Sequence, residues 1–268
     1  EGARLGWPGD AASIATRGLA AFHADFLQGD GSLRPLAADG SRPFDLYDQA
    51  FALFAYASIA GSVAGLRETA VQEARRLRDL LVETLAHPDG GFEENAPRRL
   101  PLRANPNMHL FEAALAWEHL SGSPRWGAMA RGLAELAMSR FIDPDLGMLR
   151  EYYEGDWSPA AGEAGHKIDP GRLFEWCWLL TVWGRRAGRN DALAAAARLY
   201  AAARAGGAAV VPNGMAEGLP GDDGRGAQDR RRCARAQGCC CHGFGRSRHL
   251  ELLGRRAARS LARPPGAG

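Results

Sequence analysis

Apolar residues recur at helical spacing through most of the first 205 residues of this chain, and short breaks rich in Gly, Pro, Asp and Asn separate the segments. No run has the alternation that is typical of a strand. The pattern predicts helices over 12–27, 47–64, 67–86, 107–121, 124–140, 173–187 and 190–205. Such helices bury their apolar faces only by packing on one another, so we expect an all-α fold.

The predicted helices are of two kinds. The segment 67–86 carries charged residues on one face, as a helix with one solvated side does. The segment 173–183 is apolar nearly all round apart from Glu175 and Thr181, which is typical of a buried helix. Alternation of half-polar outer helices with apolar inner helices predicts a toroid, an inner ring wrapped by an outer ring.

Two segments place polar side chains inside apolar helices. One is Asn105-Pro-Asn-Met-His-Leu-Phe-Glu-Ala113, and the other is Ile168-Asp-Pro-Gly-Arg-Leu-Phe-Glu-Trp-Cys-Trp-Leu-Leu180. Buried polar groups without a partner are costly, so His109 and Glu175 need a reason to be there. His109 and Glu112 stand three residues apart and share one helix face.

Structural explanations for these residues stay open beside functional ones. An isolated His109 would bond a backbone carbonyl in the core, and Glu175 could form an ion pair with Arg172. Asp48, near a helix start, fits an interaction with the helix dipole better than a cleft-facing role. Cys177 has no electropositive neighbour and is predicted to be a small core residue.

Both segments resemble the N-acylglucosamine 2-epimerase family, which includes mannose and related aldose-ketose isomerases, at Asn-Pro-x-Met-His-Leu and Pro-Gly-x-x-Phe-Glu-Trp. Leu46-Tyr-Asp-Gln-Ala-Phe51, Gly90-Gly-Phe-Glu93 and Phe141-Ile-Asp-Pro-Asp-Leu-Gly-Met148 extend the resemblance, which spans roughly residues 12–205. It implies the family's fold, an (α/α)6 barrel of twelve helices. Only about seven helices are predicted here, so the barrel is expected to be incomplete.

The resemblance also implies a central sugar pocket, in which His109 faces the sugar and Asn105 lies beside it. Trp176 could offer an apolar face to a sugar ring or could be a core residue. Arg103 could contact an anionic group, whereas Glu93 and Glu94 are predicted to be solvated loop carboxylates. The candidate substrate contacts are Asn105, Met108, Trp176, Asp48 and Arg103.

Sugar isomerisation and 2-epimerisation need a base that removes a proton next to the carbonyl and a group that returns it. The family is known for histidines in these roles, with no redox cofactor. The resemblance implies one of them two residues before the Phe of the second motif, where this chain has Arg172, and another in the final third, which the tail replaces. Arginine stays protonated and cannot act as a general base. The candidate catalytic residues are His109, Glu175 and Arg172, with no cofactor.

The pattern changes abruptly after residue 205. Residues 221–268 hold five large apolar residues, eleven arginines and four of the five cysteines, a composition that buries little surface. We expect a partial barrel domain over 1–205 and an irregular, poorly ordered tail over 206–268. A frameshift near 206–225 is one explanation, and a basic arm for an acidic partner is another. The tail cysteines lack the Cys-x2-Cys spacing of zinc sites, so no metal is expected.

Composition narrows the function further. A net charge of +2 gives no electrostatic argument for nucleic acid or a membrane surface. No apolar run reaches the roughly 18 residues that span a bilayer, and no signal peptide is apparent, so we expect a cytoplasmic protein. An incomplete ring leaves apolar helix faces exposed, which predicts either aggregation or a homo-oligomer that covers them.

The leading interpretation is a sugar isomerase or 2-epimerase that acts on a mannose-like or N-acylglucosamine-like substrate by proton transfer. Because Arg172 stands where the resemblance places a histidine, an inactive sugar-binding remnant is the alternative. A glycoside hydrolase or lyase on the same toroid is a third reading, and it would need two carboxylates flanking the scissile bond.

Overall fold

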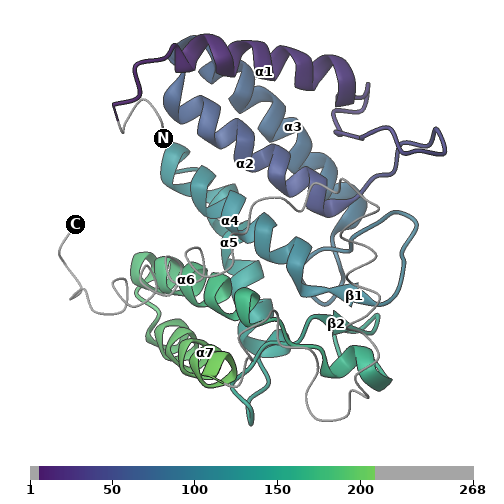
Figure 1. Cartoon of the computed structure of the whole chain (residues 1–268), viewed down its shortest axis with the longest axis vertical. Helices are drawn as coiled ribbons and strands as arrows, with labels where there is room; N and C mark the ends of the chain where they lie inside the picture. The colour runs from purple at the N-terminus through teal and green to yellow at the C-terminus, as the bar shows by residue number, and fades with distance from the viewer. Residues whose placement is uncertain (1–5, 209–268) are drawn as a thin grey trace. The chain divides into compact units, whose positions relative to one another are not determined.

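The computed structural model describes residues 6–208, without the side chains of 206–208. This part of the chain is mostly helical, which confirms the all-α class (Figure 1). The predictions for the tail, including its frameshift and its cysteines, lie outside the described residues. The α-helices are α1 (Ala11–Phe26), α2 (Leu46–Ser62), α3 (Arg67–Leu85), α4 (Ala104–Ser121), α5 (Pro124–Leu136), α6 (Pro170–Ala187) and α7 (Asn190–Ala208).

Shorter elements join these helices. Two strands of two residues each are present, β1 (Leu102–Arg103) and β2 (Tyr152–Tyr153). Two 3-10 turns (Ala64–Leu66 and Gly162–His166) and a π-helical turn (Ala137–Phe141) complete the described elements. The helix predicted over 124–140 therefore ends as an α-helix at Leu136 and continues as the π-helical turn.

The chain divides into two compact units, Glu1–Leu136 and Ala137–Gly268. In the first unit α2 lies between α3 and α4, and α5 packs against α4 (Figure 1). α3 buries a single face, as its pattern predicts, whereas α4 is buried along most of its length. Within this unit the distinction between half-polar outer helices and apolar inner helices is confirmed. The single domain over 1–205 stays a prediction.

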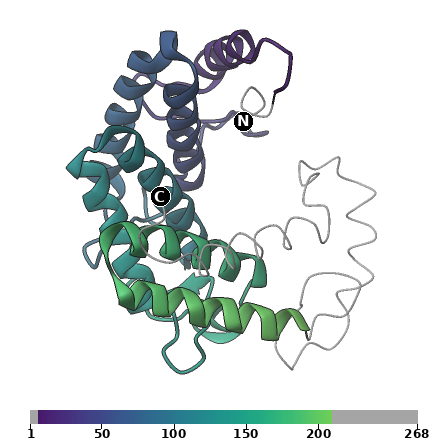
Figure 2. The ribbon, with the colours of Figure 1, turned by 90° about the vertical axis from the view of Figure 1, so that its left-hand side faces the viewer.

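In the described part of the second unit, α6 and α7 pack side by side (Figure 2). The turn between them begins at Gly188, whose φ of 65° is left-handed and suits a glycine at a helix C-terminus. Close packing depends on Gly184, because a Cβ added there would lie 3.1 Å from the Cβ of Ala192. The sequence of α6 thus fixes both the end of the helix and its contact with α7.

Two helices begin three residues or so earlier than predicted, and each start includes a proline. α4 starts at Ala104, so Pro106 lies in the first turn, where backbone N–H groups have no partner within the helix and proline costs little. α6 starts at Pro170 after Asp169, whose carboxylate accepts a hydrogen bond from Gly171 N–H at 2.8 Å. Motif residues expected in loops therefore lie on helices.

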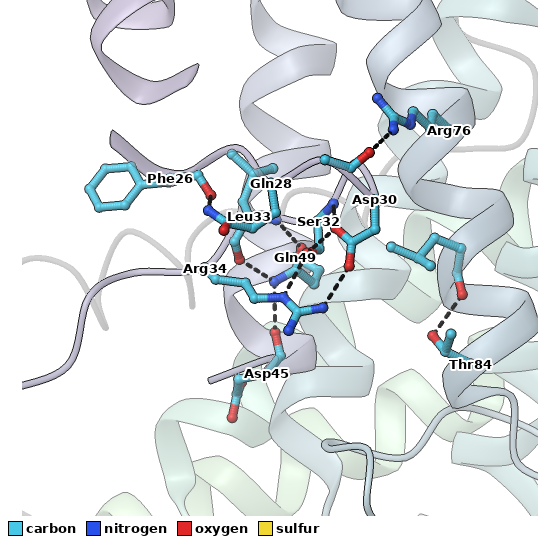
Figure 3. A network of polar contacts seen from close by, with 12 residues as sticks. Phe26, Gln28, Asp30, Ser32, Leu33, Arg34, Asp45, Gln49, Arg76 and Thr84 are labelled. Atoms are coloured by element: carbon cyan, nitrogen blue, oxygen red, sulfur yellow. Dashed lines mark hydrogen bonds and ion pairs between the residues drawn. The ribbon is translucent and has the colours of Figure 1, made fainter. Parts of the chain in front are cut away.

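Buried amide side chains of two inner helices hold the loops that precede them. Gln49 of α2 accepts a hydrogen bond from Leu33 N–H at 2.9 Å and donates one to Leu33 C=O at 2.6 Å (Figure 3). Asn107 of α4 does the same to Phe92, with both bonds at 2.9 Å. Each amide stands four residues after the N-cap of its helix. The loop before α2 and the loop before α4 are thus held in the same way, which indicates a structural repeat within the first unit.

Replacement of Asn107 by leucine is expected to lower the free energy of unfolding by about 2–5 kcal/mol, because both backbone groups of buried Phe92 lose their partner. Urea unfolding followed by circular dichroism measures the change. The control Gln72→Ala removes an exposed amide on α3 and should shift stability by less than about 0.5 kcal/mol. Equal unfolding midpoints for Asn107→Leu and wild type would contradict the role given to this amide.

Candidate functional site

A pocket of about 550 Å³ lies in the first unit, where the N-terminal ends of α2 and α4 approach the loop before α4. Three predicted substrate contacts, Asp48, Arg103 and Asn105, come together in its wall. The complete lining is Pro43, Asp45, Tyr47, Asp48, Asn95, Arg99, Arg103 and Asn105.

Asn105 is the most deeply buried predicted contact in this pocket, with 8% of its surface exposed. Its Oδ1 accepts no hydrogen bond from any described residue. A buried acceptor without a donor costs about 1–3 kcal/mol, which is a reason to expect a donor from outside the chain. A hydroxyl group of a bound molecule has the donor that this oxygen lacks.

Arg103 is held at the pocket by Glu94. Its Nε donates to Glu94 Oε2 at 2.8 Å, and its Nη2 donates to the same oxygen. Glu94 is only 6% exposed, so the prediction of a solvated loop carboxylate was wrong. The reason is a bond between residues far apart in sequence: Leu46 N–H donates to Glu94 C=O at 2.9 Å and draws the loop onto the start of α2.

The neighbouring Glu93 was also predicted to be solvated, and this prediction was wrong too. Its side chain is 16% exposed and accepts a hydrogen bond from Arg98. The arginine holds the pKa of this carboxyl below its usual value, despite partial burial. Both carboxylates of the loop are therefore committed to arginines, which fixes the loop beside the pocket.

Asp48 lies in the first turn of α2, as the dipole interpretation requires, and also lines the pocket. Its pKa is raised, first by partial removal of the carboxyl group from water and then by the charge of Asp45. Asp45 itself caps α2, since its carboxylate accepts a hydrogen bond from Tyr47 N–H at 2.8 Å. Asp48 is thus a pocket carboxyl that is easier to protonate than an ordinary aspartate.

The raised pKa of Asp48 predicts how its replacement changes stability with pH. The folded state holds the proton to higher pH than the unfolded state, so the carboxyl costs stability above its folded pKa, and the cost vanishes below the ordinary value of 3.8. Asp48→Asn should therefore be more stable than wild type at neutral pH, with a gap that narrows on acidification. Urea unfolding across this pH range measures the gap.

Asp39 supplies a control of opposite sign. Hydrogen bonds from Ser41 lower its pKa, so Asp39→Asn should lose stability at neutral pH, and the loss should fade as the pH falls. An Asp48→Asn protein that is less stable than wild type at neutral pH would show that the helix dipole outweighs desolvation at this position.

His109 lies next to the pocket, between two aromatic rings of α2. Its ring centroid is 5.1 Å from that of Tyr47, which lines the pocket, and 4.6 Å from that of Phe51. Glu112 Oε2 is 3.5 Å from its Nδ1, which confirms the shared helix face. Both ring nitrogens are buried, and neither has a hydrogen-bond partner among the described residues. The interpretation of a core histidine bonded to a backbone carbonyl was wrong.

In the second unit Arg172 and Glu175 form the ion pair that the sequence left open. Arg172 Nη1 is 3.0 Å from Glu175 Oε2, and Arg172 Nε is 3.9 Å from Asp169 Oδ2. The side chains of Arg172 and Glu175 are 27% and 20% exposed. The negative charge of Glu175 is therefore paired with an arginine on its own helix. Its catalytic role stays a prediction, as does that of Arg172.

Three other motif residues are core side chains. Trp176 is fully buried and packs edge-on against Phe141, with ring centroids 6.0 Å apart. Met108 is 1% exposed, so burial favours packing over substrate contact for both residues. Cys177 is also buried, and burial raises the pKa of its thiol to about 12. This confirms Cys177 as a small core residue.

Sequence reasoning gave no role to several residues of this region. Tyr47 and Phe51 both belong to the segment 46–51, which resembles the family. Phe51 could have been found by its register, since it is the sixth residue after the N-cap of α2, as His109 is in α4. Glu175 has the same register in α6. Asn95 and Arg99 of the pocket lie in an irregular loop that carries no such signal.

None of the helices in residues 6–208 is both long enough and apolar enough to cross a membrane. The described residues also contain no group of three or more His, Cys, Asp or Glu side chains arranged to hold a metal ion.

Solved structures of sugar isomerases and epimerases share this fold. A D-mannose isomerase matches with a TM-score of 0.61 and 22% identity, over 72% of this chain and 52% of that one. The cellobiose 2-epimerase of Spirochaeta thermophila DSM 6192 matches with a TM-score of 0.63 and 21% identity, over 76% and 56%. The fold class is therefore the (α/α)6 toroid. Each match covers about half of the length of the solved structure.

The family model of N-acylglucosamine 2-epimerase (GlcNAc 2-epimerase) matches residues 1–233, and the chain belongs to that family. Mannose-6-phosphate isomerase of Rhizobium meliloti (strain 1021) is 45% identical over 203 residues, which are 74% of this chain and 52% of that protein. The chain thus spans about half the length of this curated relative.

Proposed function

We propose that this chain carries the substrate pocket of an aldose-ketose isomerase acting on mannose or a close relative of it. Family membership and the mannose-type names of two similar proteins support the choice of substrate. The observation that carries the proposal is His109, a histidine beside a polar pocket with neither ring nitrogen hydrogen-bonded to a described residue. A cytoplasmic location and a homo-oligomer stay predictions.

In the proposed reaction, neutral His109 removes the proton from carbon 2 of the open-chain aldose. The electron pair of that C–H bond forms the double bond of an enediol as the carbonyl oxygen gains a proton. Return of a proton to carbon 1, with loss of the proton on the carbon 2 hydroxyl, gives the ketose. Glu112, 3.5 Å from Nδ1, stabilises the imidazolium that forms in between.

The pocket residues have binding roles in this proposal. Asn105 accepts a hydrogen bond from a sugar hydroxyl through its buried Oδ1. Arg103, oriented by Glu94, supplies donors to sugar oxygens at the wall of the pocket. Asp48, in the wall of the pocket, binds sugar hydroxyl groups through its carboxyl oxygens.

Arg172 favours isomerisation over 2-epimerisation. Inversion at carbon 2 needs a proton removed from one face and returned to the other, which calls for two acid–base groups, whereas one base can move a proton from carbon 2 to carbon 1 on a single face. Arg172 stands where the motif resemblance places a second histidine, and its guanidinium stays protonated beside Glu175. Among the described residues, His109 is therefore the histidine that stands at a motif position, and we assign the proton transfer to it.

Product analysis tests the proposal. The protein is incubated with mannose, fructose, mannose 6-phosphate and N-acetylmannosamine, and the products are separated and identified by NMR. We expect fructose from mannose or its phosphate, and no N-acetylglucosamine from N-acetylmannosamine. Formation of the 2-epimer would overturn the assignment of an isomerase. Binding of these sugars without any product would support the inactive sugar-binding protein instead.

A further inference from the structure

We propose that Phe51 is the surface on which the ring form of the sugar packs beside His109, and that it selects ligands that present a closed ring. The ligand class rests on the proposed function, but the binding step that Phe51 supports takes place before any proton transfer. Packing of the ring form therefore can be tested without turnover.

Exposure of Phe51 is the first observation. Phe51 is 41% exposed and begins an exposed face of α2 that continues through Ala55 and Ser58. The other faces of this inner helix are buried, since Ala50, Ala52 and Leu53 are at most 2% exposed. A phenylalanine left in water forgoes the stabilisation that full burial of its side chain would give. An exposed ring at such a position is a surface that a bound molecule can cover.

Ring geometry places this surface at the candidate site. The Phe51 centroid is 4.6 Å from that of His109, with planes at 43°, and 4.8 Å from that of Tyr47, with planes at 53°. Tyr47 lines the pocket together with Asn105, which stands one helical turn before His109. Phe51 thus borders the acid–base histidine directly and reaches the pocket through Tyr47.

The register of Phe51 is an independent observation. Phe51 and His109 are each the sixth residue after the N-cap of their helix. Gln49 and Asn107, the buried amides that hold the preceding loops, are each the fourth. Gln49 bonds the loop Leu27–Leu33 and Asn107 bonds the loop Ala86–Phe92 with the same pair of hydrogen bonds, so the register reflects a structural repeat. Phe51 therefore occupies in α2 the position that the candidate base occupies in α4.

The chemistry of the surface selects the ligand. One face of a pyranose ring carries several C–H groups, which pack against the flat apolar face of an aromatic side chain, while the hydroxyl groups at its edge bind polar partners. The polar partners are present in the pocket as Asn105, Arg103 and Asp48. An open-chain polyol has no such flat face, so Phe51 should discriminate between the two forms.

Isothermal titration calorimetry with two probes that cannot react tests the inference. Methyl α-mannoside is locked as a ring, and mannitol is an open chain. Phe51→Ala should weaken binding of methyl α-mannoside at least about tenfold and change mannitol binding less than threefold. Phe51→Trp should keep most of the affinity for the ring. Thermal unfolding of each variant establishes that it is folded.

Val82→Ala is the matched control, because Val82 is an exposed apolar residue on the outer helix α3. The Val82→Ala protein should bind both probes as tightly as wild type does. Equal losses for ring and open chain, no loss in Phe51→Ala, or a wild-type protein that does not bind methyl α-mannoside would overturn the inference. Wild type that binds this ring through Phe51 but converts no sugar would overturn the proposed isomerase and leave the inference standing.

Discussion

Replacement of His109 by glutamine is expected to lower the rate of mannose–fructose conversion by about 10²–10⁴-fold, the usual contribution of a positioned general base. Glutamine keeps a polar side chain between Tyr47 and Phe51 but cannot accept the proton from carbon 2. Because the other pocket contacts remain, KM should change little, and the loss should appear in kcat. Steady-state kinetics with mannose separates the two quantities.

His119 offers a matched control on the same helix. It is exposed in the last turn of α4, so His119→Gln should keep wild-type kcat and KM. A His109→Gln protein that retains more than about a tenth of the wild-type rate would rule out a general base at this position, since a base contributes about a hundredfold or more.

The largest effect on stability is expected at Trp117, whose replacement by alanine should lower the free energy of unfolding by about 3–5 kcal/mol. Trp117 is 1% exposed, stacks on Trp126 with centroids 5.6 Å apart, and donates a hydrogen bond from Nε1 to Leu53 C=O at 2.9 Å. One side chain thus joins α4 to both α2 and α5. Urea unfolding followed by circular dichroism gives the change.

Two further variants sharpen this test. Trp117→Phe should lose less, because the ring packing on Trp126 remains while the hydrogen bond to Leu53 is gone. Trp7→Ala removes a tryptophan that is 49% exposed and should change stability by less than about 0.5 kcal/mol. A Trp117→Ala protein as stable as the Trp7→Ala control would contradict the central place given to this contact.

Helical periodicity was sufficient to predict the class of the fold and the division into inner and outer helices, because both depend on which faces of a helix are apolar. The starts of α4 and α6 were predicted too late, since Pro106 and Pro170 read as breaks although proline is compatible with a first helical turn. Asn105 and Arg172 are consequently helix residues. For α6 a local signal was present, because Asp169 at the N-cap followed by Pro170 at the first helical position is typical of a helix start.

The candidate site was predictable in its motif residues and not in its loop. His109, Asn105 and Asp48 were visible because each interrupts or begins a helical pattern. The burial of Glu94 was not, because it depends on Leu46, which is 48 residues away in sequence and bonds the backbone of the loop. Non-local hydrogen bonds of this kind leave no periodic trace in a sequence.

The structure favours structural over catalytic roles for the second motif, Pro-Gly-x-x-Phe-Glu-Trp at residues 170–176. Its carboxylate, Glu175, is paired with Arg172 on the same helix, and its Trp176 is fully buried. Both findings match the structural alternatives stated for these residues. The chemistry proposed for this chain therefore depends on His109 and the pocket residues of the first unit.

Deuterium incorporation tests the central claim most directly. Mannose is incubated in deuterated water with wild-type protein, with His109→Gln and with His119→Gln, and NMR follows label at carbon 1 of fructose and carbon 2 of mannose. We predict labelled fructose from wild type and His119→Gln, and neither label nor fructose from His109→Gln. Labelled fructose from His109→Gln at the wild-type rate, or no fructose and no label from folded wild-type protein, would contradict proton transfer by His109.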